Sequence, residues 1–135
     1  MKRSEPLQKR LDSANRELDR LRARGDMGSR YEDVRHAAQR MEEVIVNRNL
    51  RGRDLEKQGK PDDAIALYEQ NVSDEVDTPH PYWRLTILYD KAGKYKEEIR
   101  VLEKAVLVFG RREKQREQVA KFMSRLDKAK SKAYS

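Results

Sequence analysis

Two stretches, LEKQGKPDDAIALYE at residues 55–69 and YDKAGKYKEEIRVLE at residues 89–103, decide the fold because they match in kind and lie 34 residues apart. Gly59 and Gly93 fall at the same point of the two stretches, and a Lys follows each of them. A fixed period of this length is typical of arrays of helical units. The sequence therefore predicts two copies of one unit, each formed by a helix, a glycine turn and a second helix.

Outside these stretches, Pro and Gly residues divide the chain into segments with helical spacing. Apolar residues recur at intervals of three and four from Leu7 to Leu21, and again from Tyr31 to Ile45. The two stripes predict an antiparallel helical hairpin, with Ser29 as the cap of the second helix. No segment alternates with period two, so no sheet is expected. The predicted helices after the first cover residues 29–58, 61–71, 81–91, 94–109 and 111–132. Residues 29–58 allow either one unbroken helix, which is favoured, or a break at Asn47 and Asn49.

The spacing and the pattern of residue sizes resemble the tetratricopeptide repeat. The first unit has Gly52, Leu55, Gly59, Ala64 and Tyr68 at the small, large, turn, small and large positions of that family. The second unit has Leu85, Tyr89, Gly93, Leu102 and Ala105. Four positions depart from the family pattern: Arg48 replaces an aromatic residue, Thr86 occupies the small position of the second unit, and Asn71 and Glu98 each replace alanine.

The resemblance implies an all-α fold of stacked antiparallel helical hairpins, which is a tetratricopeptide-like α-solenoid with a right-handed twist. Within one structural domain, residues 1–45 would form an amino-terminal hairpin and residues 46–110 the two repeat units. Residues 111–135 would form a basic capping helix and a tail. In such a stack each unit buries its apolar face against its neighbours and leaves the remaining surface to solvent.

Composition agrees with a thin helical stack of this kind. The chain has 135 residues, 41% charged and 36% hydrophobic, which suits one domain with a small core. Its net charge is +7, and most of the excess lies at the carboxyl end, where the last 35 residues hold 10 Lys and Arg against 4 Asp and Glu. A polyanion would be expected to contact that end first.

Signals of catalysis and of cofactor binding are missing from the sequence. The chain has no Cys, and its two His residues, His36 and His80, belong to no metal-ligand pattern. There is no glycine-rich phosphate loop. A run of apolar residues long enough to cross a membrane is also missing, and residues 1–10 are polar. We therefore expect a soluble cytoplasmic protein that is not an enzyme and uses no cofactor, metal or membrane.

In tetratricopeptide arrays the first helix of each unit lines a groove, so the resemblance implies which residues line it here. Most of them are basic or aromatic, which suits an acidic peptide or helix because Lys and Arg make charge-assisted hydrogen bonds with carboxylates. The implied function is a non-catalytic protein–protein interaction module or scaffold. The groove residues are Asn49, Arg53, Lys57, Trp83, Arg84, Ile87, Lys91, Lys121 and Arg125.

The residues leave three alternatives open. Trp83 is expected either in the groove or buried against the preceding loop or the amino-terminal helices. The basic residues of the last helix would allow the chain to associate with nucleic acid, although a capping helix also needs a polar outer face. The leucine stripe of the first helix would allow self-association. The polyanion-binding residues of the second alternative are Arg112, Arg116, Lys128 and Lys132.

Overall fold

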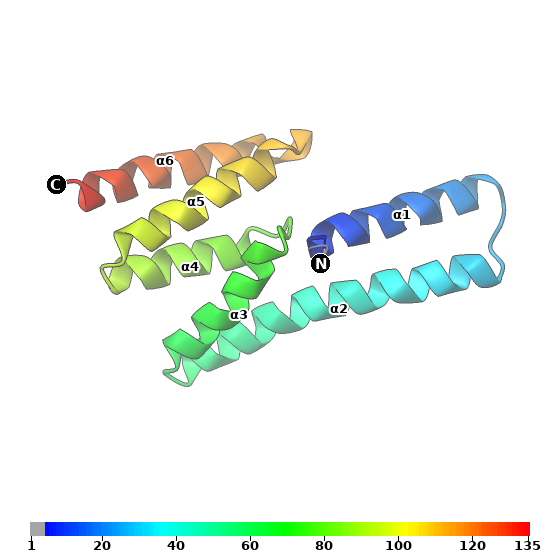
Figure 1. The fold of residues 1–135 in the computed structure, drawn as a ribbon, viewed down its shortest axis with the longest axis horizontal. Coiled ribbons are helices and arrows are strands. Elements are labelled where there is room, and N and C mark those ends of the chain that lie inside the picture. The colour runs from blue at the N-terminus through cyan, green and yellow to red at the C-terminus, as the bar shows by residue number, and fades with distance from the viewer. Residues whose placement is uncertain (1–4) are drawn as a thin grey trace.

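A computed structural model describes residues 5–135, so residues 1–4 of the predicted amino-terminal hairpin lie outside the described range. The described residues are all-helical and contain no strand, which confirms the predicted all-α class. Each helix packs against the next one along the chain (Figure 1). The helices are α1 (Leu7–Ala23), α2 (Ser29–Lys57), α3 (Pro61–Ser73), α4 (His80–Lys91), α5 (Tyr95–Gly110) and α6 (Arg116–Ala133), with the 3₁₀ turn η1 (Glu113–Gln115) before α6.

The predicted amino-terminal hairpin is present in the structure, formed by α1 and the first half of α2. The leucines of α1 that were considered for self-association are buried within the chain, so that alternative is wrong for these side chains. Arg22 Nε donates to the Tyr31 hydroxyl at 2.9 Å and so joins the two helices. The cap prediction for Ser29 is also wrong, because α2 begins at Ser29 itself and Glu32 hydrogen-bonds to Arg35 instead.

Of the two alternatives for residues 29–58, the structure has the unbroken helix, because α2 continues past Asn47 and Asn49 and across the predicted boundary between residues 45 and 46. Figure 1 shows α1 lying along the first half of α2 and α3 along the second half. The amino end of α1 meets the carboxyl end of α3, where Asp74 Oδ1 accepts from the Leu7 N–H at 3.0 Å. Pro6, the cap residue of α1, makes no side-chain cap hydrogen bond. Asp74 therefore caps a helix that is distant in the sequence.

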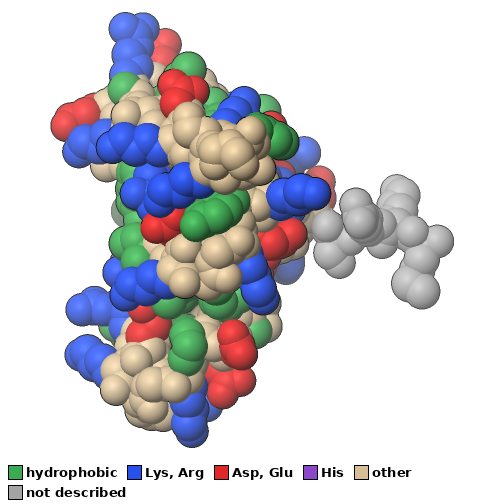
Figure 2. All heavy atoms as spheres, turned by 90° about the vertical axis from the view of Figure 1, so that its left-hand side faces the viewer, with side chains coloured by type: hydrophobic (Ala, Val, Ile, Leu, Met, Phe, Trp, Pro, Cys, Tyr) green, Lys and Arg blue, Asp and Glu red, His purple; other side chains and the backbone are tan. Residues whose placement is uncertain are grey.

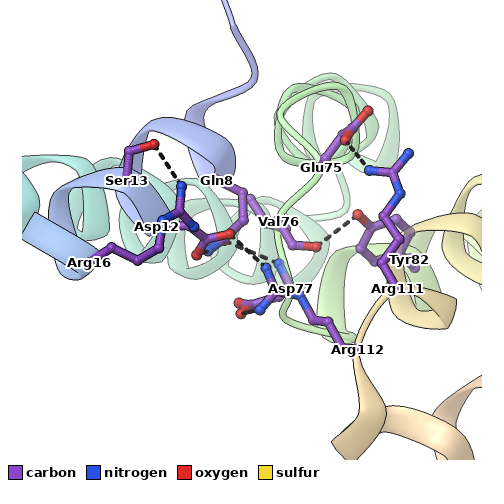
Figure 3. A network of polar contacts seen from close by, with 10 residues as sticks. All are labelled: Gln8, Asp12, Ser13, Arg16, Glu75, Val76, Asp77, Tyr82, Arg111 and Arg112. Carbon is purple, nitrogen blue, oxygen red and sulfur yellow. Dashed lines mark hydrogen bonds and ion pairs between the residues drawn. The ribbon is translucent and has the colours of Figure 1, made fainter.

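A polar network joins α1 to the loop between α3 and α4 and to the start of the last helical segment (Figure 3). Arg112 contacts the Asp12 carboxylate at 2.9 Å and the Asp77 carboxylate at 3.0 Å. The Asp77 N–H donates to Gln8 Oε1 at 3.2 Å. Arg112 has an extended backbone, with φ −119° and ψ 116°. The helix predicted from residue 111 therefore begins later, at Arg116.

The glycine turns after α1, α2 and α4 have the same hydrogen-bond pattern. Gly25, Gly59 and Gly93 have φ values of 68°, 74° and 71°. In each turn, the N–H after the glycine donates to the carbonyl five residues earlier. Glu75 has the corresponding place after α3 with φ 55°, a left-handed conformation that costs a non-glycine residue energy. Its carboxylate contacts Lys104 and Arg111, at 2.8 and 3.0 Å.

The core contains the residues that the size pattern placed there. Gly52 is buried where α2 crosses α3, and a Cβ atom at this position would lie 2.6 Å from Cε1 of Tyr68. Tyr68 and Ala64 are fully buried. Farther along, Tyr82 of α4, Phe109 of α5 and Phe122 of α6 form an aromatic cluster.

Two of the four departures from the family pattern form one polar network in the structure. Asn71 is fully buried, and its Nδ2 donates to the Ile45 carbonyl at 3.1 Å and to Asn49 Oδ1 at 3.0 Å. Arg48 Nη1 donates to Asn71 Oδ1 at 3.0 Å and to Asp74 Oδ2 at 2.6 Å. The amide of Asn71 is therefore satisfied inside the stack, as a buried polar group must be.

Candidate interaction face on α2, α4 and α6

Side-chain contacts bring α2, α4 and α6 together on one face of the molecule. Arg84 of α4 binds Glu56 of α2 through two nitrogens, with Nε donating to Oε2 at 3.1 Å. Trp83, also on α4, stacks on Phe122 of α6 with the ring centroids 4.4 Å apart. Arg125 of α6 reaches back to α4. We call this surface the α2–α4–α6 face.

Glu56 is the centre of a polar cluster where α2 meets α4. It accepts from the Tyr68 hydroxyl at 2.6 Å as well as from Arg84. Burial opposes ionisation of Glu56, but the hydrogen bonds from Arg84 and Tyr68 outweigh it and hold its pKa below the ordinary value. Burial and the Glu56 carboxylate raise the pKa of Tyr68. The positive charge of Arg84 is therefore balanced by the Glu56 carboxylate within the chain.

His80, the first residue of α4, borders the same cluster. Its ring contacts the Tyr68 ring edge-to-face, with the centroids 5.6 Å apart. Burial lowers the pKa of His80, and the nearby charges of Arg53 and Arg84 lower it further. The ring is therefore neutral at pH 7.

Three basic residues of the predicted groove are exposed to solvent and form no ion pair with any described residue. They are Arg53, Lys57 and Lys91. Lys121 is paired with Glu117 on its own helix, at 3.4 Å between exposed side chains. An exposed pair of this kind contributes little to stability and opens readily. These four cations are therefore available to a ligand.

The other five predicted groove residues are engaged within the chain or half-buried. Arg84 and Arg125 are in ion pairs, and the Asn49 side chain is bonded to Asn71. Ile87 is half-buried. Trp83 is half-buried as well, and it packs on α6 rather than on the preceding loop or the amino-terminal helices, which corrects the second interpretation.

The far end of the face contains a buried carboxylate. The side chain of Glu98 is 0% exposed, and Arg125 approaches it at 3.3 Å. Burial raises the pKa of Glu98, and Arg125 only partly opposes that shift. Asp90 binds Lys132 at 2.6 Å and Arg125 at 3.4 Å, and the hydrogen bond from Lys132 lowers its pKa. This network fastens the end of α6 to α4 and α5.

The residues of the nucleic-acid alternative are only partly available to a polyanion. Arg112 is held by Asp12 and Asp77, and Lys132 is held by Asp90, so ion pairs occupy two of the four. Arg116 and Lys128 are exposed, and their positions in α6 differ by 12 residues, which separates them by about 120° around the helix and about 18 Å along it.

An exposed stripe on α2 was not identified in the sequence. The side chains of Val46 and Leu50 are 51% and 50% exposed. Arg53 and Lys57 continue the row, so that the four residues follow one another at spacings of four, three and four. With 100° per residue, these four side chains lie within one narrow sector of the helix. We call them the α2 stripe. The spacing itself was a usable signal, because it repeats helical periodicity in a sector of α2 separate from the buried residues.

Figure 2 looks at the end of the molecule where the turns after α2 and α4 lie. Lys and Arg side chains project along the left edge of this view, with Asp and Glu more scattered. Within residues 5–135, every helix is too short or too polar to cross a lipid bilayer. No group of three His, Asp or Glu side chains in that range could hold a metal ion.

Comparison with known proteins gives no relative for this chain. No protein-family model, no curated protein and no solved structure matches it. The functional interpretation therefore depends on the geometry of the α2–α4–α6 face.

Proposed function

We propose that this chain is a tetratricopeptide-like interaction module that binds an acidic segment of another protein on the α2–α4–α6 face. The observation that carries the proposal is the α2 stripe, where two exposed apolar side chains adjoin Arg53 and Lys57. Lys and Arg make strong charge-assisted hydrogen bonds with carboxylates. An apolar contact beside these cations would add the area that charge alone does not supply.

Two structural features support the tetratricopeptide-like part of the proposal. The turns at Gly59 and Gly93 have matching φ values and hydrogen bonds one period apart. Gly52 is buried beneath Tyr68, as the small and large positions of that family require. Both features suit repeated helical hairpins that pack on one another.

The test uses a fluorescein-labelled acidic peptide, rich in Glu with interspersed Leu, and measures its binding by fluorescence anisotropy at about 0.15 M salt. The double variant Arg53→Glu, Lys57→Glu is expected to weaken binding at least about tenfold, which corresponds to about 1.4 kcal/mol. A matched control, Arg40→Glu with Arg51→Glu, makes the same charge change on the other side of α2. It is expected to shift the dissociation constant by less than about threefold.

Equal weakening by the two double variants would mean that only net charge matters, and the proposal would fail. A labelled DNA or RNA duplex serves as the second ligand in the same assay. Tighter binding of nucleic acid than of the peptide, with a steep salt dependence, would replace the proposal with the nucleic-acid alternative.

A further inference from the structure

We infer that the partner segment is an amphipathic α-helix that docks lengthwise on the α2 stripe, with apolar side chains on Val46 and Leu50 and acidic side chains near Arg53 and Lys57. This inference rests on the proposed function and specifies the conformation of the partner.

The geometry of the α2 stripe is that of a helix ridge. Val46, Leu50, Arg53 and Lys57 follow one another at spacings of four, three and four residues. The stripe is therefore about 16 Å long, at 1.5 Å per residue. A second helix lying alongside presents its own side chains at the same spacing, so that the ridge of one helix enters the groove of the other. An apolar pair followed by an acidic pair at this spacing matches the stripe.

The backbone of α2 favours a helical ligand over an extended one. An extended peptide usually gains affinity by pairing its main chain with a sheet edge. Residues 5–135 contain no strand, and α2 is one unbroken helix whose main-chain groups are bonded internally. A helical ligand satisfies its own main chain and needs only side-chain contacts. The α2 stripe provides contacts of that kind.

Charge decides where each end of the ligand's contact surface lies. Arg53 and Lys57 occupy one end of the stripe, and neither has an ion-pair partner among the described residues. Val46 and Leu50 are each about half exposed at the other end. A ligand helix docked in the reverse direction would place its carboxylates on Val46 and Leu50, where they lose water without gaining a partner. The stripe therefore determines the direction in which a given ligand helix docks.

The experiment compares three labelled peptides of about 20 residues, long enough to form a helix in water with an alanine-rich background. The first peptide has two leucines and then two glutamates at the spacing of the stripe. The second has the same residues with a proline at its centre, which breaks the helix. The third is the helical peptide with all glutamates replaced by glutamine. Circular dichroism verifies their helical content, and fluorescence anisotropy measures their dissociation constants.

The helical acidic peptide is expected to bind at least about tenfold more tightly than either of the other two. The variant Val46→Ser, Leu50→Ser is expected to weaken binding of this peptide by about tenfold, because the leucines of the peptide then have no apolar side chains on α2 to cover. A matched control is Val44→Ser with Leu107→Ser, which removes side chains of similar exposure, 42% and 53%, outside the stripe. The control is expected to leave the dissociation constant within about twofold.

Each remaining outcome overturns a different statement. Equal binding of the helical and proline peptides, abolished by Arg53→Glu with Lys57→Glu, would overturn the helical ligand and leave the proposed function standing. Failure of every peptide to bind would overturn both. Equal loss in the control variant would place the contact off the stripe. A dimer in light scattering that Val46→Ser with Leu50→Ser dissociates would make a second copy of the chain the occupant instead.

Discussion

Gly52→Ala tests the packing of α2 against α3. The new Cβ would lie 2.6 and 2.7 Å from Cε1 and Cζ of Tyr68, closer than carbon atoms approach in folded proteins. Tyr68 is fully buried, and its hydroxyl donates to Glu56, so the ring cannot move without disturbing the carboxylate that binds Arg84. The variant should therefore disturb both the core and the α2–α4–α6 face.

The magnitude follows from three contributions. Overpacking of a core usually costs about 1–3 kcal/mol. A weakened hydrogen bond from Tyr68 to the charged Glu56 adds about 1.5 kcal/mol. Replacement of glycine by alanine within a helix returns about 1 kcal/mol. We expect Gly52→Ala to lower the free energy of unfolding by about 1.5–3.5 kcal/mol.

Urea unfolding followed by circular dichroism measures this change. Gly110→Ala is the matched control, because Gly110 lies in a helix and its Cβ would meet no atom within 4 Å. The control should be neutral or more stable by up to about 1 kcal/mol. In a Tyr68→Leu background the ring is gone, so Gly52→Ala should there cost less than about 0.5 kcal/mol. The same large loss in both backgrounds would refute the contact as the cause.

Three further predictions concern single carboxylates. Asp74→Ala should lower the free energy of unfolding by about 2–4 kcal/mol in urea titrations, because α1 loses its cap and Arg48 loses a half-buried partner; a loss below about 0.5 kcal/mol would contradict this. Glu75→Gly should be more stable than Glu75→Ala by about 1 kcal/mol in the same assay, because only glycine relieves the left-handed backbone; equal stability would contradict the strain. Because the pKa of Glu98 is raised in the folded state, the folded protein keeps this carboxyl protonated at pH values where the unfolded chain has already ionised it. The contribution of Glu98 to the free energy of unfolding is therefore fully present below about pH 4.3 and is lost as the pH rises through the raised pKa. The difference in unfolding free energy between the wild type and Glu98→Gln, measured from pH 4 to 8, should therefore move in favour of Glu98→Gln as pH rises, and a constant difference would contradict it.

The helices and their turns could be predicted from the sequence because local rules determine them. Gly59 and Gly93 adopt a left-handed conformation that glycine enters at no steric cost, and the chain turns at both. The small and large residues of the first unit were also predictable, since Gly52 and Tyr68 meet as the size pattern indicates. The period of 34 residues connected these local features to the order of the helices.

The junction between α1 and α3 could not be predicted in this way. Asp74 caps Leu7 from a position 67 residues away, whereas cap patterns in a sequence concern neighbouring residues. Asn71 and Arg48 appeared only as departures from the family pattern. Their partnership depends on the way α3 packs against α2, which brings Arg48 to the side chains of both Asn71 and Asp74.

The sequence predicted which cations lie on the candidate face, but not which of them form ion pairs within the chain. The repeat register selected Arg53 and Arg84 by the same rule, yet only Arg84 has a carboxylate within reach. Which cations remain available depends on acids such as Glu56, whose side-chain direction follows from helix packing. Val46 and Leu50 were not among the predicted groove residues, and their exposure depends on how α1 and α3 pack along α2.

The most direct test of the α2–α4–α6 face maps ligand contacts by NMR. The helical acidic peptide is titrated into ¹⁵N-labelled protein, and amide chemical shifts are followed. We expect the largest changes along residues 46–57 of α2, with smaller ones at Lys91 and Lys121, and little change along α1. Changes confined to α1 or to Arg116 and Lys128 of α6, with residues 46–57 unaffected, would contradict binding on this face.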